Sequence, residues 1–365
     1  MHGGFYPGFD TTKPNFDLPV VYEDSHFAIV NKPPGIVCYS QQDDNHGVMT
    51  VRHALPFVLK PPKRGTCGIY MRPLAVHRLD KPTSGLLVIA KTKPAMVDLS
   101  RQFEDRQVKK TYTAIVNGIP SEPVESSITA EEAKKMGVEV DIGKNGDDES
   151  NWQLIDHALD NKSAITVWKQ LDCSKSLKAK DNSLTLVELK PKTGRFHQLR
   201  RHMSLVRDCP LVGDTVSIST YFLARKFAFH VWDLCTYIGH IILSNHVMPT
   251  YISFDAFICF DSAFLRCKKY DGGGDAKKLR GRGLFLCSNK VVLNHPYYNT
   301  EDGRLEWNSL PDSEKWGNGM IRFSEDGTTL EVHASLDLPN KFHSFLAAER
   351  RRYDKFYEYR DNEIE

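Results

Sequence analysis

The sequence has no pair of cysteines in the C-x-x-C spacing, although eight cysteines are scattered along its 365 residues. This absence argues against a zinc ribbon and against a disulfide framework, and it favours a reducing compartment. The first 19 residues also lack the apolar core of a signal peptide and the Arg- and Ser-rich pattern of a transit peptide. We therefore expect no targeting signal and a location in the cytoplasm or the nucleus.

Motifs of several large enzyme classes are also missing. The chain has no phosphate-binding P-loop, no glycine-rich dinucleotide fingerprint, no H-E-x-x-H zinc motif and no G-x-S-x-G nucleophile elbow. His197 and His202 are five residues apart, which does not match the spacing of a zinc-binding pair on a helix. These absences leave little support for a metal site.

What is present is the composition of a globular protein, with 41% hydrophobic and 26% charged residues. This mixture excludes a mainly disordered chain, a collagen-like chain and a coiled coil. The length is sufficient for one large domain or two ordinary ones.

The charge is distributed unevenly, although the formal net charge is only +2. Residues 51–110 contain 13 Lys and Arg against 4 Asp and Glu, and residues 188–207 contain 6 against 1. Residues 131–160 are the reverse, with 3 basic and 9 acidic residues. This pattern indicates either a basic face that binds a polyanion or an ordinary uneven surface, and charge alone does not separate the two.

Short segments rich in β-branched and aromatic residues dominate the secondary-structure pattern. They predict strands at 26–32, 85–92, 110–118, 163–171, 183–190, 284–293 and 328–336. Apolar residues at helical spacing predict helices at 93–107, 194–206 and 340–360. Few helices separate the strands, so a doubly wound parallel sheet is not expected. We predict an α+β fold with a large, mostly antiparallel mixed sheet flanked by helices and loops.

Two stretches interrupt this pattern. Residues 130–151 are acidic and turn-rich, and we expect a surface loop there. Residues 216–268 are atypical, because 11 of the 53 are aromatic and none is Glu or Gln. Within that block, residues 234–254 carry no Asp, Glu, Lys or Arg, but their polar residues and a proline argue against a membrane-spanning helix.

Polar residues gather where predicted strands end. Lys32 closes the first strand at a Pro-Pro-Gly turn, and the loop 77–85 leads directly into an apolar strand. A third polar segment, 192–200, joins a strand to a helix, where backbone amides and Arg195 are able to face an anion. Taken singly, each residue also has an ordinary structural interpretation: Asp80 as a turn cap, Tyr112 as a core residue and Arg195 as a surface cation.

Taken together, these segments resemble the RluA branch of the RNA pseudouridine synthases. The resemblance rests on KPPG at 32–35, HRLDKPTSG at 77–85, KTYTAIVNG at 110–118, KPKTGRFHQLRRHM at 190–203 and PLVGDT at 210–215. It covers roughly residues 20–336, apart from the two interruptions. It implies the pseudouridine synthase fold for residues 25–347, with an N-terminal extension (1–24) too short for an S4-type RNA-binding module and a helical tail (348–365).

The resemblance also assigns roles to individual residues. It implies that Asp80 is the catalytic aspartate, that Tyr112 stacks on the flipped uracil and that Arg195 pairs with the aspartate. Arg78 matches the arginine that fills the gap left in the RNA stack. The remaining candidates are basic residues expected to contact RNA phosphates, namely Lys32, Lys81, Lys109 and Arg200.

The implied function is conversion of uridine to pseudouridine in tRNA or rRNA by a monomer that needs no cofactor, no metal, no DNA and no membrane. A nearby arginine would keep the aspartate ionised beside an apolar base, and whether the aspartate attacks the sugar or assists an elimination stays open. Two alternatives remain: a catalytically inactive RNA-binding or RNA-folding protein on the same fold, and a membrane-associated protein defined by residues 216–268.

Residues 216–268 also invite a different explanation, namely a translated, unspliced intron. Joining Thr215 to Lys269 restores LVGDTKYDGG, which resembles the family pattern. Val216 and Ser217 can be encoded by the splice-donor sequence GTAAGT, and the codon AAG for Lys268 ends in an acceptor AG. We therefore expect that this block is either a retained intron or an atypical insertion.

Overall fold

The computed structural model describes residues 13–39, 49–121, 127–128, 132, 136, 152–214 and 283–364, with side chains as far as residue 358. The predicted insertion at 216–268 lies outside the described residues. So does the predicted acidic loop at 130–151, apart from Glu132 and Met136.

Twelve strands are distributed along the described chain. They are β1 (Val20–Glu23), β2 (Phe27–Lys32), β3 (Ile69–Ala75), β4 (Ser84–Thr92), β5 (Lys109–Asn117), β6 (Ser127–Ile128), β7 (Trp152–Asp156), β8 (Ile165–Lys175), β9 (Ser183–Pro191), β10 (Leu286–Asn294), β11 (Ile321–Phe323) and β12 (Leu330–Ser335). The α-helices are α1 (Val51–Val58), α2 (Lys93–Glu104), α4 (Gln198–Arg201), α8 (Glu301–Ser309), α9 (Asp312–Lys315) and α10 (Asn340–Ile364). Three short helical turns complete the set, η2 (Lys180–Asn182), η3 (His202–Val206) and η4 (Gly317–Gly319).

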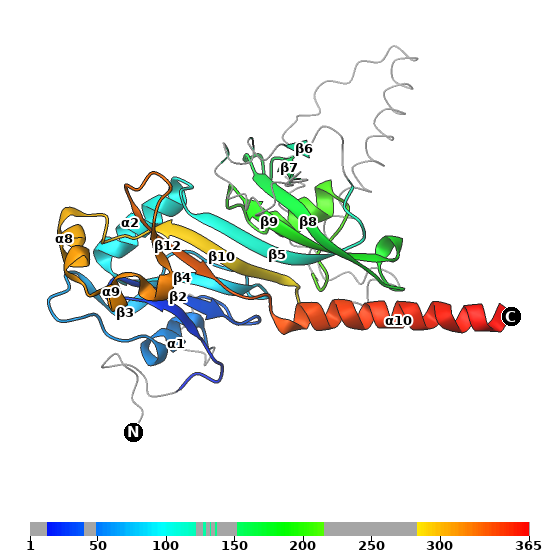
Figure 1. Ribbon diagram of the computed structural model, residues 1–365, viewed down its shortest axis with the longest axis horizontal. Helices are drawn as coiled ribbons and strands as arrows, with labels where there is room; N and C mark the ends of the chain where they lie inside the picture. Colours follow the sequence, from blue (N-terminus) through cyan, green and yellow to red (C-terminus); the bar gives the residue numbers. More distant parts are fainter. Residues whose placement is uncertain are drawn as a thin grey trace, which may run out of the picture.

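These strands form one 12-stranded sheet with the order β1-β2-β4-β10-β5-β9-β8-β7-β6. Strand β3 also pairs with β4, β12 pairs with β10, and β11 pairs with β12. Among the described strands only the β4–β10 pair is parallel. The sheet runs through the main body of the molecule, and helix α10 extends away from it (Figure 1). The predicted α+β fold with a mostly antiparallel mixed sheet is confirmed.

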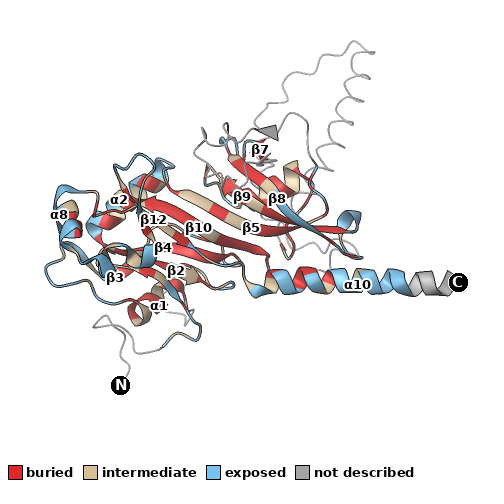
Figure 2. Cartoon of the chain, in the orientation of Figure 1, coloured by how far each residue is buried: buried red, intermediate tan, exposed pale blue. Residues whose placement is uncertain are grey.

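Alternating side chains of the central strands supply two cores. Phe27 and Ile29 on β2, with Leu86 and Val88 on β4, pack on α2. Their neighbours Ala28, Val30, Leu87 and Ile89 point to the opposite face and pack on α1. Because side chains alternate across a strand, an apolar run such as that of β4 is buried on both faces. Figure 2 shows this burial along the centre of the sheet.

Most predicted elements have counterparts in the structure. All seven predicted strands are present as β2, β4, β5, β8, β9, β10 and β12, with boundaries shifted by a few residues. The predicted helix at 194–206 is shorter and begins at Gln198, because His197 has a left-handed backbone with φ of 52°. The predicted helix at 340–360 is the 25-residue α10, which includes the tail expected at 348–365 as far as Ile364. None of the described helices is long and apolar enough to span a membrane.

The first turns of helix α10 anchor it to the sheet. Phe342 and Phe345 pack with Phe285 and with Ile115 of β5. Further along, Ser176 donates a hydrogen bond to Glu349 at 2.8 Å. The exposed residues of α10 concentrate beyond this point (Figure 2).

A close approach of two strands explains the glycine that begins the apolar run of β4. Gly85 has φ of +112°, and a Cβ atom built there would lie 2.2 Å from the carbonyl oxygen of Ser288 on β10. A side chain at this position would separate the parallel β4–β10 pair. Gly85 therefore allows the loop before β4 to lie beside β10.

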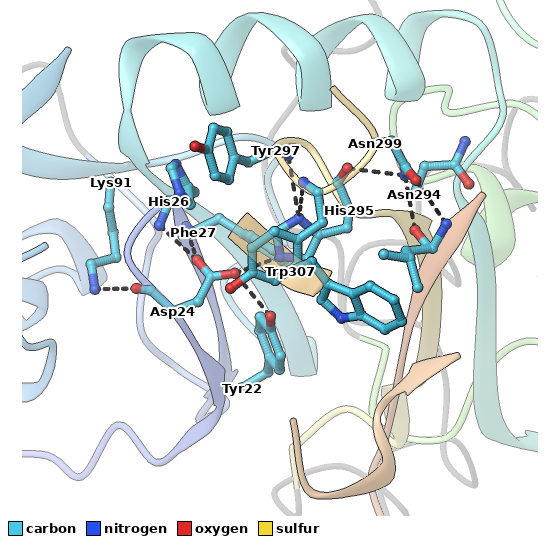
Figure 3. A network of polar contacts seen from close by, with 12 residues as sticks. Tyr22, Asp24, His26, Phe27, Lys91, Asn294, His295, Tyr297, Asn299 and Trp307 are labelled. Atoms are coloured by element: carbon cyan, nitrogen blue, oxygen red, sulfur yellow. Dashed lines mark hydrogen bonds and ion pairs between the residues drawn. The ribbon is translucent and has the colours of Figure 1, made fainter. Parts of the chain in front are cut away.

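A buried polar network joins the turn between β1 and β2 to the end of β10 (Figure 3). Asp24, in the turn between β1 and β2, accepts a hydrogen bond from His295 at the end of β10, at 2.7 Å. The other nitrogen of His295, Nδ1, accepts hydrogen bonds from the backbone N–H groups of Tyr297 and Tyr298. The imidazole is thus fully bonded and links segments that are 271 residues apart in the sequence.

Candidate active site

The loop between β3 and β4 carries Asp80. Leu79 is buried, and its backbone N–H approaches the sulfur of Cys38 at 3.4 Å. The preceding His77 accepts a hydrogen bond from the backbone N–H of Val88 through Nε2, at 3.1 Å. Burial lowers the pKa of His77 to about 3, so its imidazole is neutral and remains an acceptor. These inward-pointing side chains hold the loop against the sheet.

The carboxylate of Asp80 is bound on one side only. Its Oδ2 atom lies 3.2 Å from Nη1 of Arg200 and 3.5 Å from Nε2 of His197. Within the described residues, no hydrogen bond or ion pair reaches Oδ1. The side chain is 22% exposed, so the unbonded oxygen is accessible to a ligand.

Arg200 lies between two carboxylates. Its Nε and Nη2 atoms bind Oδ2 and Oδ1 of Asp214 at 2.8 and 2.6 Å. Burial alone would lower the pKa of Arg200, but Asp214 and Asp80 together raise it. The guanidinium is therefore charged at any physiological pH and carries the positive charge next to Asp80.

This geometry corrects the predicted partner of Asp80. Arg200, not Arg195, supplies the adjacent cation. Helix α4 begins at Gln198, which places Arg200 on the helix beside the cavity, whereas Arg195 precedes the helix. The Nε atom of Arg195 donates to the backbone oxygen of Ser163 at 3.0 Å. The expected phosphate contact by Arg200 is likewise corrected, because its side chain is only 4% exposed and binds two carboxylates.

Two cavities meet at Asp80. One, of about 650 Å³, is lined by Tyr112, Lys192 and Arg195 among others. The other, of about 710 Å³, is lined by the turn at Pro34 and Gly35, by Lys81 and by Asp214. Five residues line both cavities, namely Arg78, Leu79, Asp80, His197 and Arg200. The predicted catalytic residues Asp80, Tyr112 and Arg195 therefore line one cavity.

Tyr112 comes from the middle of β5, where it pairs with Leu189 of β9 and with Ser288 of β10. Burial raises the pKa of its hydroxyl to about 12. The phenol is thus neutral at physiological pH. Its ring packs partly against two hydrophobic clusters and is fixed in the cavity wall.

Lys32 does not lie where the sequence predicts. It is fully buried, and its ammonium donates to the backbone oxygens of Pro33, Ile36 and Lys81 at 2.9, 2.7 and 3.3 Å. Burial lowers its pKa to about 8. Lys32 therefore joins the Pro-Pro-Gly turn to the Asp80 loop and does not face RNA phosphate in this structure, which corrects the predicted contact.

Other predicted RNA-binding residues lie on the surface around the cavities. Arg78 and Lys81 are exposed at the rim, on either side of Leu79 and Asp80. Lys109 forms an ion pair with Glu331 at 3.8 Å and lines a small hollow of basic residues. That hollow is lined by Arg106, Lys109, Lys110, Lys190, Lys192 and Lys290. Burial, together with the neighbouring lysines, lowers the pKa of Lys192 to about 8, as expected of a strongly positive region.

Three site residues were not assigned a role from the sequence. Asp214 lies in the PLVGDT segment, but nothing in the pattern indicated its pairing with Arg200. His197 was considered only as half of a zinc pair, although its Nε2 approaches Asp80. Gln198 accepts from the backbone N–H of Arg195 and donates to the backbone oxygen of Ile165, so it holds the loop before α4.

His202 is a structural residue. Its two ring nitrogens lie 2.9 Å from the hydroxyl of Thr166 and 3.1 Å from the backbone oxygen of His157. Burial lowers its pKa to about 4. In the part of the chain that the structure describes, no cluster of three or more His, Cys, Asp or Glu residues could hold a metal ion.

Comparison with known proteins points to one family. The profile of the family described as RNA pseudouridylate synthase matches residues 26–205, which include Asp80, Tyr112 and Arg200. A tRNA pseudouridine synthase C from Vibrio vulnificus is 35% identical over 202 residues, covering 54% of this chain and 73% of the relative. A ribosomal large subunit pseudouridine synthase D from Zymomonas mobilis is 33% identical over 243 residues, covering 66% and 68% respectively.

One solved structure is also similar over most of the chain. It is the human RNA pseudouridylate synthase domain containing 4, which is 20% identical and covers 91% of this chain and 93% of its own, with a TM-score of 0.47.

Proposed function

Because this chain belongs to the RluA-type family of RNA pseudouridine synthases, which are isomerases, we propose that it converts uridine to pseudouridine in tRNA or rRNA. We assign Asp80 as the nucleophile, and the reaction uses no cofactor. In this isomerisation the bond between N1 of uracil and C1′ of ribose breaks. The base turns, C5 bonds to C1′, the C5 proton is lost to solvent, and N1 gains a proton.

Access to the reacting atoms requires base flipping, because a paired uridine is enclosed in the RNA stack. Tyr112 offers an aromatic face on which the uracil stacks, an interaction worth about 1–3 kcal/mol per base. Arg78 is exposed at the rim of both cavities and is suited to fill the gap in the stack, because a guanidinium is planar and also binds phosphate. The lysines beside the cavity attract the RNA backbone without reading sequence.

The observation that carries this proposal is the arrangement of Asp80. Its carboxylate has one oxygen bound to Arg200 and the other unbonded, where two cavities meet. A close cation favours the ionised form of a carboxylate, which a nucleophile requires, and opposes the effect of an apolar base. A protein that only binds or folds RNA has no chemical need for such a carboxylate.

The test uses RNA labelled with tritium at C5 of uracil, prepared as tRNA and as large-subunit rRNA transcripts. Wild-type protein is expected to release tritium from one of these, whereas Asp80→Asn should lower release by at least about 1,000-fold and bind the same RNA with similar affinity. The matched control is Asp160→Asn, because Asp160 is 54% exposed and forms a two-bond pair with Arg201 at 2.7 and 2.8 Å.

Two outcomes would contradict the proposal. Undiminished tritium release by Asp80→Asn would show that Asp80 is not the nucleophile. Binding of RNA by the wild-type protein without any release would instead favour the inactive RNA-binding alternative.

A further inference from the structure

Resting on the proposed function, we propose that Asp214 is a positioning residue for the same reaction. It holds the Arg200 guanidinium so that Arg200 binds a single oxygen of Asp80 and leaves the other oxygen free to react. Asp214 itself does not touch the reacting atoms.

The contacts of Arg200 are unequal. It binds Asp214 through two short hydrogen bonds, at 2.8 and 2.6 Å, but Asp80 through one longer bond at 3.2 Å. The Asp214 side chain is completely buried, whereas that of Asp80 is 22% exposed. The pair between Arg200 and Asp214 is therefore the fixed one, and Asp80 approaches a guanidinium that is already oriented.

A guanidinium that had only Asp80 as a partner would bind both of its oxygens, because the planar fork of arginine matches a carboxylate. Both oxygens would then be hydrogen-bonded, and neither would be a good nucleophile. Asp214 occupies the Nε and Nη2 edge of Arg200 and leaves Nη1 for Asp80. The negative charge of Asp214 also offsets part of the positive charge of Arg200, so Arg200 attracts the carboxylate of Asp80 less strongly.

Local backbone structure explains why Asp214 lies at this place. The N–H of Asp214 donates to the backbone oxygen of Leu211 at 3.2 Å, and that of Phe285 donates to the oxygen of Val212 at 3.0 Å. Between them, Gly213 has φ of +78°, and a Cβ atom there would lie 1.9 Å from the carbonyl oxygen of Gly283. Only glycine permits this contact, which sets Asp214 against Arg200.

The decisive variant is Asp214→Asn, which keeps the side-chain shape and removes the charge. We expect kcat for tritium release to fall by about 100-fold with little change in KM for RNA, because a small displacement of a catalytic group costs about that much. The acid limb of the pH profile should also move to lower pH. Without the charge of Asp214, the whole positive charge of Arg200 acts on the carboxylate of Asp80.

Asp214→Glu is the second variant and keeps the charge. It is expected to lose rate, because the longer side chain shifts Arg200, but to keep the acid limb close to that of wild type. Asp160→Asn is the control, since Asp160 forms the equivalent two-bond pair with the neighbouring Arg201 away from Asp80. Neither its rate nor its pH profile should change. Thermal unfolding followed by circular dichroism reports whether each variant is folded.

The results separate this inference from the proposed function. If Asp80→Asn is inactive but folded Asp214→Asn matches Asp160→Asn in rate and pH profile, the positioning role is wrong and the proposed function stands. A rate loss in Asp214→Asn and Asp214→Glu alike, with the acid limb unmoved in both, would make Asp214 merely structural. If Asp80→Asn remains active, the proposed function itself fails.

Discussion

Two buried networks in this protein share the same chemistry and differ in one respect. In each, an aspartate in a turn near a strand end pairs with a cationic or imidazole side chain from a distant part of the chain. Asp24 binds His295, which is 271 residues away, and Asp80 binds Arg200, which is 120 residues away. The difference lies in how many of the carboxylate's acceptor positions are occupied.

Asp24 has both oxygens fully bonded. Oδ1 accepts from the backbone N–H groups of His26 and Phe27 at 2.6 and 2.9 Å, and Oδ2 accepts from Tyr22 and His295 at 2.8 and 2.7 Å (Figure 3). Burial raises the pKa of Asp24, but His295 and the hydrogen bonds outweigh it and lower the pKa to about 2. This network has no free position for a ligand.

Asp80, in contrast, has one bonded oxygen and one that the described residues leave unbonded, beside two cavities. The side chain of Asp80 is 22% exposed and lines both cavities, so a ligand in either cavity can reach it. The comparison shows two uses of a carboxylate. Asp24, with both oxygens hydrogen-bonded, holds secondary-structure elements together, whereas Asp80, with one unbonded oxygen at a cavity, is available for chemistry.

The largest effect expected in testing this comparison comes from the cation beside Asp80. Arg200→Met should lower kcat/KM for tritium release by at least about 100-fold, because the cation that binds the carboxylate of Asp80 is lost. The acid limb of the pH profile should move to higher pH, opposite to the shift expected for Asp214→Asn.

Arg195→Met is the matched variant for Arg200→Met. Because the Nε atom of Arg195 donates to Ser163 and Asp80 pairs with Arg200, this change should leave the acid limb in place. Its effect is expected on RNA affinity, measured by filter binding. A raised acid limb in Arg195→Met with none in Arg200→Met would return the pairing role to Arg195.

The next largest effect should fall on stability and not on activity. Asp24→Asn removes the charged partner of the buried network and should lower the free energy of unfolding by about 3 kcal/mol, measured by urea denaturation. Tritium release per folded molecule should be unchanged. Asp208→Asn is the control, because its ion pair with Lys180 is exposed and should be worth less than about 1 kcal/mol.

The same network predicts an acid dependence. The pKa of Asp24 in the folded protein, about 2, is below its ordinary value of 3.8. The stabilisation is therefore fully present above pH 3.8 and is lost as the pH falls towards 2. This part of the acid-induced loss should be absent in Asp24→Asn. A loss of activity per folded molecule in that variant would contradict the division between the two networks.

The sequence predicted the central strands well, because short apolar runs that contain β-branched residues, such as that of β4, are typical of strands buried on both faces. The family resemblance also assigned Asp80 and Tyr112 to one site, and both residues line the same cavity. The sequence could not distinguish Arg195 from Arg200, because both occur in one segment and the choice depends on the left-handed His197 that delays the helix. The predicted phosphate contact of Lys32 was wrong, because its ammonium donates to backbone oxygens. A sequence shows the charge of a lysine but not the backbone groups that it binds.

The pair of Asp24 and His295 was also not predicted from the sequence. Neither residue lies in a motif that assigned it a role, and their pairing depends on β10 lying one strand away from β2 in the sheet, with β4 between them. Contacts over such sequence separations follow from the topology, and local patterns do not contain them. The pairing of Asp214 with Arg200 was missed for a related reason, since it requires the turn at Gly213 to meet Gly283.

The smallest effect is expected from deleting residues 216–268, which leaves a chain of 312 residues. The two described ends of this region already meet, because Phe285 donates to Val212 at 3.0 Å and Gly213 contacts Gly283. After deletion, Thr215 and residues 269–282 still join Asp214 to Gly283, and at about 3.3–3.6 Å per extended residue they span such a contact easily.

We expect the shortened protein to be at least as active as the full chain and more soluble, because a segment rich in apolar and aromatic residues is removed. Closing a shorter connection costs less entropy, so a gain of about 1 kcal/mol in the free energy of unfolding is expected. If the Asp80–Arg200–Asp214 network is complete in the described residues, the pH profile of tritium release by the shortened protein should match that of the full chain. Sequencing the mature messenger RNA tests the origin of residues 216–268. A transcript that retains the block, together with loss of activity on deletion, would exclude the intron explanation. The segment would then contribute to the Asp80–Arg200–Asp214 network.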